Sequence, residues 1–180
     1  MTQIAPLGAS VEARLAGADS RIFVFLQAWR MARGDLVMPL RNAFDPMTVR
    51  GLLPYLWIYR FDPDRDDYVV RLAGEEINNA WGRSIKGLTM REVVGDQDYP
   101  IMRERWDTIL GTPLIHYGAS SERLSALDTR RAERMLTPLA DNDGTPNHIL
   151  GISLYRISPT DTSHPSLEPE DITQIPCSEV

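Results

Sequence analysis

The amino-acid sequence predicts a single α+β domain built on an antiparallel sheet. Two aromatic and β-branched segments, 55–61 and 68–73, flank a polar Asp- and Pro-rich turn, which is the pattern of a β-hairpin. Further strand-like segments gather near the end of the chain instead of alternating regularly with helices. Hairpin connections give antiparallel pairing, so we expect this sheet to carry helices on one side. A length of 180 residues suits one domain.

The N-terminal part predicts two helices after a flexible leader. Residues 1–19 are small, polar and weakly patterned, so we expect them to be flexible. Ser20 can cap a helix with apolar residues at helical spacing, and Gly34 ends it. Asp45 followed by Pro46 is a helix-start signal, and the helix that it begins should be short.

The middle of the chain predicts short helical segments followed by one longer helix. Residues 75–81 read as a short helix after the hairpin. Thr89 can cap a helical turn over 90–94. Asp98 can cap a better helix over 98–110, whose apolar residues share one face.

Three strands and a tail complete the expected domain. We expect strands over 114–120, 131–139 and 148–157, with an Asn-Asp-Gly turn between the last two. The segment 158–180 is rich in proline, carries five acidic residues and has no lysine or arginine. Such a segment buries too little apolar surface to offset its ordering entropy, so we expect a disordered tail after a folded region of 20–157.

Composition limits the partners and the compartment. The net charge of -6 argues against nucleic acid as a partner, because phosphate binding requires a basic face. No apolar stretch is long enough to span a bilayer, and the N-terminus lacks the pattern of a signal peptide. Cys177 is the only cysteine, which favours the cytoplasm and suggests an inert thiol in a loose tail. Lys86 is the only lysine, a bias that suggests a GC-rich bacterial genome.

The order of elements and one glycine-punctuated segment resemble the PAS domain family. The residues that carry the resemblance follow the hairpin: Asn78 or Asn79, Ala80, Gly82, Gly87 and Leu88. An upstream run resembles one bacterial, single-domain branch of that family: Trp29, Arg33–Gly34, Pro39, Phe44–Asp45–Pro46 and Leu52–Leu53–Pro54. The resemblance covers about 23–157. It implies a five-stranded antiparallel sheet with helices on one face, an added N-terminal helix and a sensory, non-enzymatic role.

Within that family, the resemblance argues against two cofactors. Haem-binding members use an axial histidine, usually from the long helix, but 98–110 contains none and His116 just after it is the only candidate. Light-sensing members need a reactive cysteine in the helical segment, and 78–86 contains none. We therefore expect neither haem nor covalently attached flavin. Motifs for a hydrolase, a phosphate-binding loop and an EF-hand are also missing, so we expect no metal site and no enzymatic activity.

The fold implied by the resemblance places large side chains between the long helix and the sheet. The candidate ligand-binding residues are Arg71, Trp81, Tyr99, Met102, Trp106, Tyr117 and Met135. Arg71 and Arg134 could offer a guanidinium to an anionic ligand. We expect a module that binds a small molecule or relays a signal in trans to a partner protein. Two alternatives stay open: a scaffold with a filled core, and an enzyme on another α+β fold.

The N-terminal helix also predicts a homodimer. Its apolar residues point in more directions than one core face can use, and a helix of that kind usually buries the extra side elsewhere. We expect Phe25 and Trp29 to contribute to a contact between two copies of the chain. The alternative is that the helix wraps its own domain and buries everything there.

Overall fold

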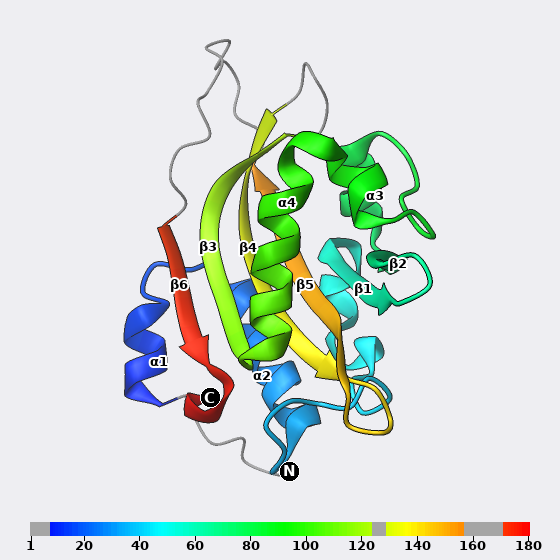
Figure 1. The fold of residues 1–180 in the computed structure, drawn as a ribbon. Coiled ribbons are helices and arrows are strands. Elements are labelled where there is room, and N and C mark those ends of the chain that lie inside the picture. Colours follow the sequence, from blue (N-terminus) through cyan, green and yellow to red (C-terminus); the bar gives the residue numbers. More distant parts are fainter. Residues whose placement is uncertain (1–7, 124–128, 157–170) are drawn as a thin grey trace.

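The computed structural model describes residues 8–123, 129–156 and 171–180, and it contains one six-stranded antiparallel sheet (Figure 1). The strand order is β2-β1-β5-β4-β3-β6. The helical elements are α1 (Ala9–Arg14), α2 (Ser20–Arg33), the 3-10 segment η1 (Pro46–Tyr55), α3 (Glu75–Trp81), α4 (Met90–Gly111) and the 3-10 turn η2 (Cys177–Glu179). The strands are β1 (Leu56–Asp62), β2 (Asp67–Ala73), β3 (Leu114–Arg123), β4 (Thr129–Ala140), β5 (Pro146–Arg156) and β6 (Asp171–Pro176).

The α+β class and the antiparallel sheet are confirmed, with one more strand than predicted. Every strand pairs antiparallel with its neighbours, from the β1–β2 hairpin to the β3–β6 pair. In Figure 1, α4 lies across one face of the sheet and α2 lies behind it on the other face. Thus α3 and α4 share one face, and the added N-terminal helix covers the opposite one.

The alternation of side chains along the strands creates two separate cores. In β1, Leu56 and Ile58 belong to the core under α2, whereas Trp57 and Tyr59 belong to the core under α4. Successive side chains of a strand point to opposite faces, so each strand supplies both cores. A sheet with two apolar faces needs both faces covered.

Helix α2 is a core element, which corrects the role predicted for two of its residues. Phe25 and Trp29 are fully buried within their own domain, and the Trp29 indole N–H donates to the Pro138 carbonyl at 3.0 Å. These side chains therefore cannot form a contact between copies. The N-cap is Asp19, whose side chain accepts from the Arg21 backbone N–H, one residue before the predicted cap at Ser20.

Part of the predicted leader is ordered. Helix α1 occupies Ala9–Arg14, and Val11 and Leu15 are fully buried against the core under α2. The helix is too short to show a clear apolar period in the sequence, and tertiary burial holds it in place. Residues 1–7 lie outside the described part of the chain.

The end of the predicted tail is also ordered, and it supplies the sixth strand. Strand β6 pairs with the edge of β3, and Ile175 and Cys177 are fully buried beneath it. Arg33 at the end of α2 donates to the backbone carbonyls of Cys177 and Val180. The proline and acidic residues of the segment 158–180 led to the prediction of disorder. The few apolar side chains of β6 nevertheless pack on a core that the rest of the chain forms. Burial raises the pKa of the Cys177 thiol to about 12, which keeps it protonated.

Most of the segment predicted as a disordered tail, 158–180, falls within residues 157–170, which are outside the described residues.

The helix across the sheet begins at the predicted Thr89 cap, but its break lies at Gly95 and not at the cap predicted at Asp98. Thr89 caps α4 through a capping box with Glu92, as its position suggested. The two predicted segments, 90–94 and 98–110, join into one helix with a break at Gly95, whose φ is +81°. Glycine adopts a positive φ without a steric clash, so the bend causes no backbone strain at this position. No helix in the described part of the chain is long and apolar enough to cross a membrane.

Candidate functional site

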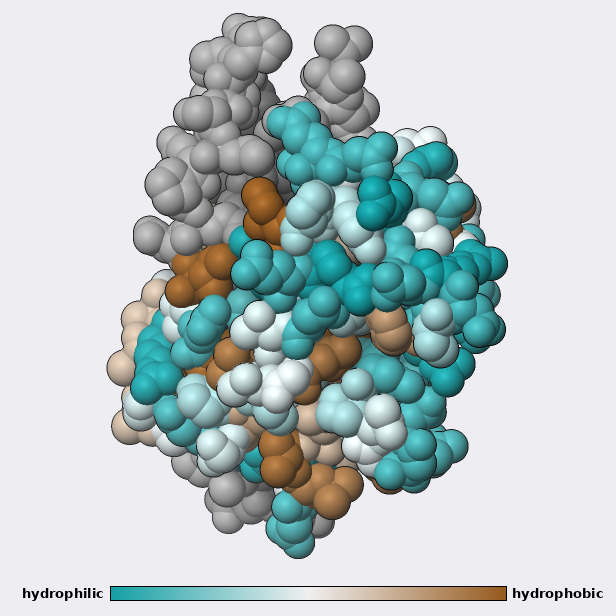
Figure 2. All heavy atoms as spheres, in the orientation of Figure 1, coloured by the Kyte–Doolittle hydropathy of each residue, from teal (hydrophilic) through white to brown (hydrophobic). Residues whose placement is uncertain are grey.

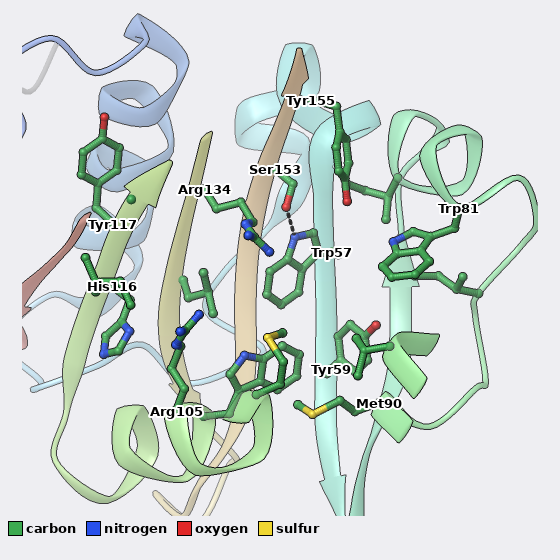
Figure 3. Close-up of a pocket in the computed structure, with 18 residues that line it drawn as sticks. Trp57, Tyr59, Trp81, Met90, Arg105, His116, Tyr117, Arg134, Ser153 and Tyr155 are labelled. Carbon is green, nitrogen blue, oxygen red and sulfur yellow. Dashed lines mark hydrogen bonds between the residues drawn. The ribbon is translucent and has the colours of Figure 1, made fainter. Parts of the chain in front are cut away.

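A cavity of about 60 Å³ lies between α4, α3 and the sheet (Figure 3). This volume is several times the ~10–15 Å³ that one water requires. The residues around it come from α3, α4 and the segment between them, and from β1, β3, β4, β5 and β6. The lining residues of α3, α4 and the segment between them are Ile77, Trp81, Ile85, Met90, Val94, Met102, Arg105 and Trp106. The sheet and its edge supply Trp57, Tyr59, His116, Tyr117, Gly118, Arg134, Leu136, Ser153, Tyr155 and Ile172.

An aromatic cluster centred on Trp106 fixes α4 above the cavity floor. The Trp106 ring stacks on Trp57 with centroids 5.5 Å apart and an interplanar angle of 11°. It meets Tyr59 edge to face at 4.8 Å and Tyr68 at 5.1 Å. Such offset-stacked and edge-to-face pairs add stabilisation beyond the apolar area that they bury. The position of α4, and so the height of the cavity, depends on this cluster.

A polar group beside the cluster holds the same helix at its outer side. The Tyr68 hydroxyl donates to Asp107 at 2.8 Å, and Arg103 donates to the same carboxylate. Arg103 also reaches the hairpin turn at Asp66. Burial and the bond to Asp107 raise the pKa of the Tyr68 phenol well above its ordinary value, so it stays protonated as a donor.

The second wall of the cavity is held by one asparagine. The Asn78 side chain donates to the Ala73 carbonyl at 3.3 Å and accepts from the Ile85 backbone N–H at 3.1 Å. These bonds join the end of β2, helix α3 and the segment that follows it. Gly82 ends α3 in the left-handed region with φ +64°, which a glycine adopts at little cost. The wall residues Trp81 and Ile85 are positioned by this arrangement.

Polar groups converge on one side of the cavity. Figure 3 shows Arg105, Arg134 and His116 on the side of β3 and β4, with Trp81 and Tyr155 on the far side of Trp57. The cavity lining contains no Asp or Glu among the described residues. The site is therefore a cationic end joined to an aromatic end.

Two indole N–H groups of the site differ in how they are satisfied. Trp57 donates to the Ser153 hydroxyl at 2.9 Å, the dashed line in Figure 3. Trp106 is 2% exposed, and its Nε1 has no hydrogen-bond partner among the described residues. A buried N–H without a partner costs about 1–3 kcal/mol, so an acceptor brought into the cavity would recover that free energy.

Three of the seven predicted site residues contribute side chains to the cavity: Trp81, Met102 and Trp106. Tyr117 lies at the rim, but its ring points away from the cavity (Figure 3) and its hydroxyl donates to Glu133 at 3.0 Å.

The other three predicted residues lie elsewhere. Arg71 is exposed at a β-bulge in β2, where Ile58 pairs with Leu72 and Tyr59 with Val70, so one residue is left over. Tyr99 packs near the start of the straight part of α4, with the Arg91 guanidinium 4.0 Å above its ring. Met135 is fully buried in the core under α2. These placements correct the prediction for Arg71, Tyr99 and Met135.

The prediction missed several lining residues that the strand alternation reveals once its phase is known. Arg134 and Leu136 face the cavity because Met135 between them faces the other core. In β1, Leu56 and Ile58 alternate with Trp57 and Tyr59, and this alternation likewise indicates that Trp57 and Tyr59 face the cavity side of the sheet. Arg105 lies next to Trp106 on α4, and charge alone gave no reason to place it inward.

The surface over this face is largely hydrophilic. Figure 2 shows mostly polar spheres, with hydrophobic residues exposed in separate patches, one of them at the lower end of the view. Ile101 on α4 is 60% exposed, so this helix also carries an outward apolar residue. No group of three or more potential metal ligands occurs among the described residues.

The sequence was compared with models of protein families and with curated proteins. A family model for a PAS domain matches residues 18–154. No curated protein matches the sequence.

Solved structures of similar shape include a light-oxygen-voltage (LOV) protein of Rhodobacter sphaeroides, 14% identical with a TM-score of 0.46, the match covering 61% of this chain and 65% of that one. A LOV domain studied with a flavin analogue is 15% identical with a TM-score of 0.48, covering 62% and 84%. An RNA-binding LOV receptor is 14% identical with a TM-score of 0.46, covering 86% of this chain and 36% of that one.

Replacing Trp106 should destabilise the packing of α4 on the sheet. We expect Trp106→Ala to lower the free energy of unfolding by about 3–5 kcal/mol, because it removes a buried ring and leaves a cavity against three aromatic neighbours. Ile101→Ala, at an exposed position of the same helix, should change it by less than about 0.5 kcal/mol. Urea unfolding followed by circular dichroism measures both. Equal, small effects would show that the cluster does not fix α4.

Proposed function

Because this chain belongs to the PAS domain family, we propose that it is a sensory module that binds a small molecule in the cavity beneath α4 and relays the signal in trans to a partner protein. The observation that carries the proposal is a cavity in which polar side chains converge on an otherwise aromatic lining. Pockets of that composition are the usual small-molecule sites of proteins.

The cavity also has a built-in connection to the rest of the domain. Its ceiling is α4, and Trp106 of α4 contacts β1 and β2 through its aromatic neighbours. A ligand that changes the height of α4 would therefore change the packing of the β1–β2 hairpin. A packed core of this kind responds by switching between discrete arrangements instead of deforming continuously.

The modest volume favours a second candidate, a scaffold without ligand. At about 60 Å³ the cavity holds about four to six waters, and a filled core would serve protein–protein interaction alone. The unpartnered Trp106 N–H favours the first candidate, because a core built only for stability gains from satisfying every buried donor.

Charge and cysteine usage support the setting that we propose. A net charge of -6 opposes binding to nucleic acid. The single, buried Cys177 needs no oxidising compartment, which supports a cytoplasmic protein. We propose no catalytic role for the cavity residues.

We also propose that the module is a homodimer through the outer side of α2. Val24, Ala28 and Met31 follow one another at helical spacing, and Val24 and Met31 are 51% and 60% exposed. A shallow apolar groove runs beside them against η1, with Phe44 and Val49 on its far side. A twofold contact would cover the same stripe in both copies. Phe25 and Trp29, on the inner side, have no part in it.

A ligand should leave the native protein on denaturation. We expect mass spectrometry of small molecules released from the full chain, purified without denaturation, to detect a compound that Met102→Trp loses and Ile101→Trp keeps. The first variant fills the cavity from α4, and the second adds the same bulk at an exposed position of that helix.

The same compound in all three proteins would show that it binds elsewhere. No compound in any of them, in protein drawn from cells grown in rich and in minimal medium, would favour the scaffold.

Charge placed on the outer side of α2 should separate the copies. We expect light scattering at tens of micromolar, an ordinary range of dimer affinities, to give a dimer for the unmodified protein and a monomer for Met31→Glu. Ile101→Glu, equally exposed but on α4, should stay dimeric. Phe25→Glu should lose the fold, because it buries a charge in the core. A monomeric unmodified protein would contradict the proposal.

A further inference from the structure

We infer that the ligand of this cavity is a small aromatic carboxylate, with its acid group held between Arg105 and Arg134 and its ring among Trp57, Trp81 and Tyr155. The inference rests on the proposed function, since it names the chemical class that the same cavity selects. It follows from three features of the lining: its charge, its aromatic end and a buried donor without a partner among the described residues.

The charge of the lining selects an anion. Arg105 from α4 and Arg134 from β4 lie at the same end of the cavity, with His116 on the same side (Figure 3). The described residues of the lining include these two arginines and no carboxylate. Guanidinium groups bind carboxylates through paired, charge-assisted hydrogen bonds, which are stronger than bonds between neutral groups.

The opposite end of the cavity selects a flat apolar group. Trp81 and Tyr155 lie across the cavity from the arginines, and the Trp57 ring lies between the two ends (Figure 3). Ile77 of α3 and Ile85 of the segment after it also line the cavity, and both are buried. Aromatic walls bind a ring through stacked and edge-to-face contacts. An aliphatic acid of the same charge would leave these walls without a partner.

A buried donor without a partner among the described residues also lines the cavity. The Trp106 N–H is buried and without a partner among the described residues, and Trp106 lines the cavity next to Arg105 on the same helix. A carboxylate has more acceptor positions than two guanidinium groups use, so it can also accept from this indole. One ligand group would then satisfy the only indole of the aromatic cluster that the protein leaves unsatisfied, since Trp57 already donates to Ser153.

The volume limits the ligand to a single ring. A free volume of about 60 Å³ corresponds to about four to six waters, which suits a molecule of benzoate size and is far below that of a dinucleotide. Met102 and Arg105 are only partly buried, so the entrance can widen by side-chain rotation without moving the sheet. We therefore take benzoate as the probe.

Isothermal titration calorimetry of the full chain at neutral pH tests the inference with benzoate, its neutral isostere benzamide, and acetate. We expect benzoate to bind about tenfold or more tightly than either of the others. Arg105→Gln and Arg134→Gln should each weaken benzoate by about tenfold or more and leave benzamide unchanged. Arg50→Gln removes the same charge from an exposed position away from the cavity, and it should bind benzoate like the unmodified protein. Thermal unfolding of each variant confirms that it is folded.

The outcomes separate this inference from the function on which it rests. Benzamide that binds as tightly as benzoate, or arginine variants that keep full affinity for benzoate, would overturn the anionic class and leave a small-molecule module standing. The same holds if neither probe binds while the native protein still releases a cavity ligand. No binding and no released ligand would overturn both.

Discussion

The packing of Trp106 between Trp57, Tyr59 and Tyr68 is the constraint on which the cavity face of the sheet depends. One indole ring fixes the height and the rotation of α4, and with it the ceiling of the cavity. Tyr68 and Arg103 both donate to the Asp107 carboxylate, and these bonds hold the outer side of the same helix turn. The ring is buried, yet its N–H finds no partner in the described protein. We propose that a ligand that accepts a hydrogen bond from this N–H would act on the packing of α4, because the same side chain holds that helix on the sheet.

The opposite face explains why the domain needs its flanking segments. An antiparallel sheet with apolar side chains on both faces exposes one of them unless something covers it. Here α2 covers it through Phe25 and Trp29, while α1 and β6 complete the cover around Leu15 and Cys177. Arg33 and the Arg14–Glu179 ion pair join the two ends of the chain there. We propose the exposed outer side of α2 as the surface for a second copy and the cavity on the opposite face as the ligand site.

The helices and strands could be predicted from the sequence better than the core that each of their side chains faces. Cap residues such as Asp45 and Thr89 act locally, so the starts of η1 and α4 could be placed from them, whereas the break of α4 at Gly95 was expected at Asp98. Met135 was assigned to the wrong core because charged and apolar residues alternate irregularly in β4, and a one-residue change of phase reverses every side chain. Arg71 was displaced by a bulge that no local signal marks. The segments α1 and β6 are ordered by burial against distant parts of the chain, which composition cannot show.

The most direct test of this account follows the indole N–H signals of the four tryptophans in a 15N-labelled full chain while benzoate is added. The account predicts that the Trp106 signal moves furthest, because its N–H gains an acceptor, and that Trp81 moves with it. The Trp29 signal should stay in place, since its N–H is bound to Pro138 in the other core. A Trp106 signal that stays fixed while benzoate binds, or a Trp29 signal that moves as far, would contradict it.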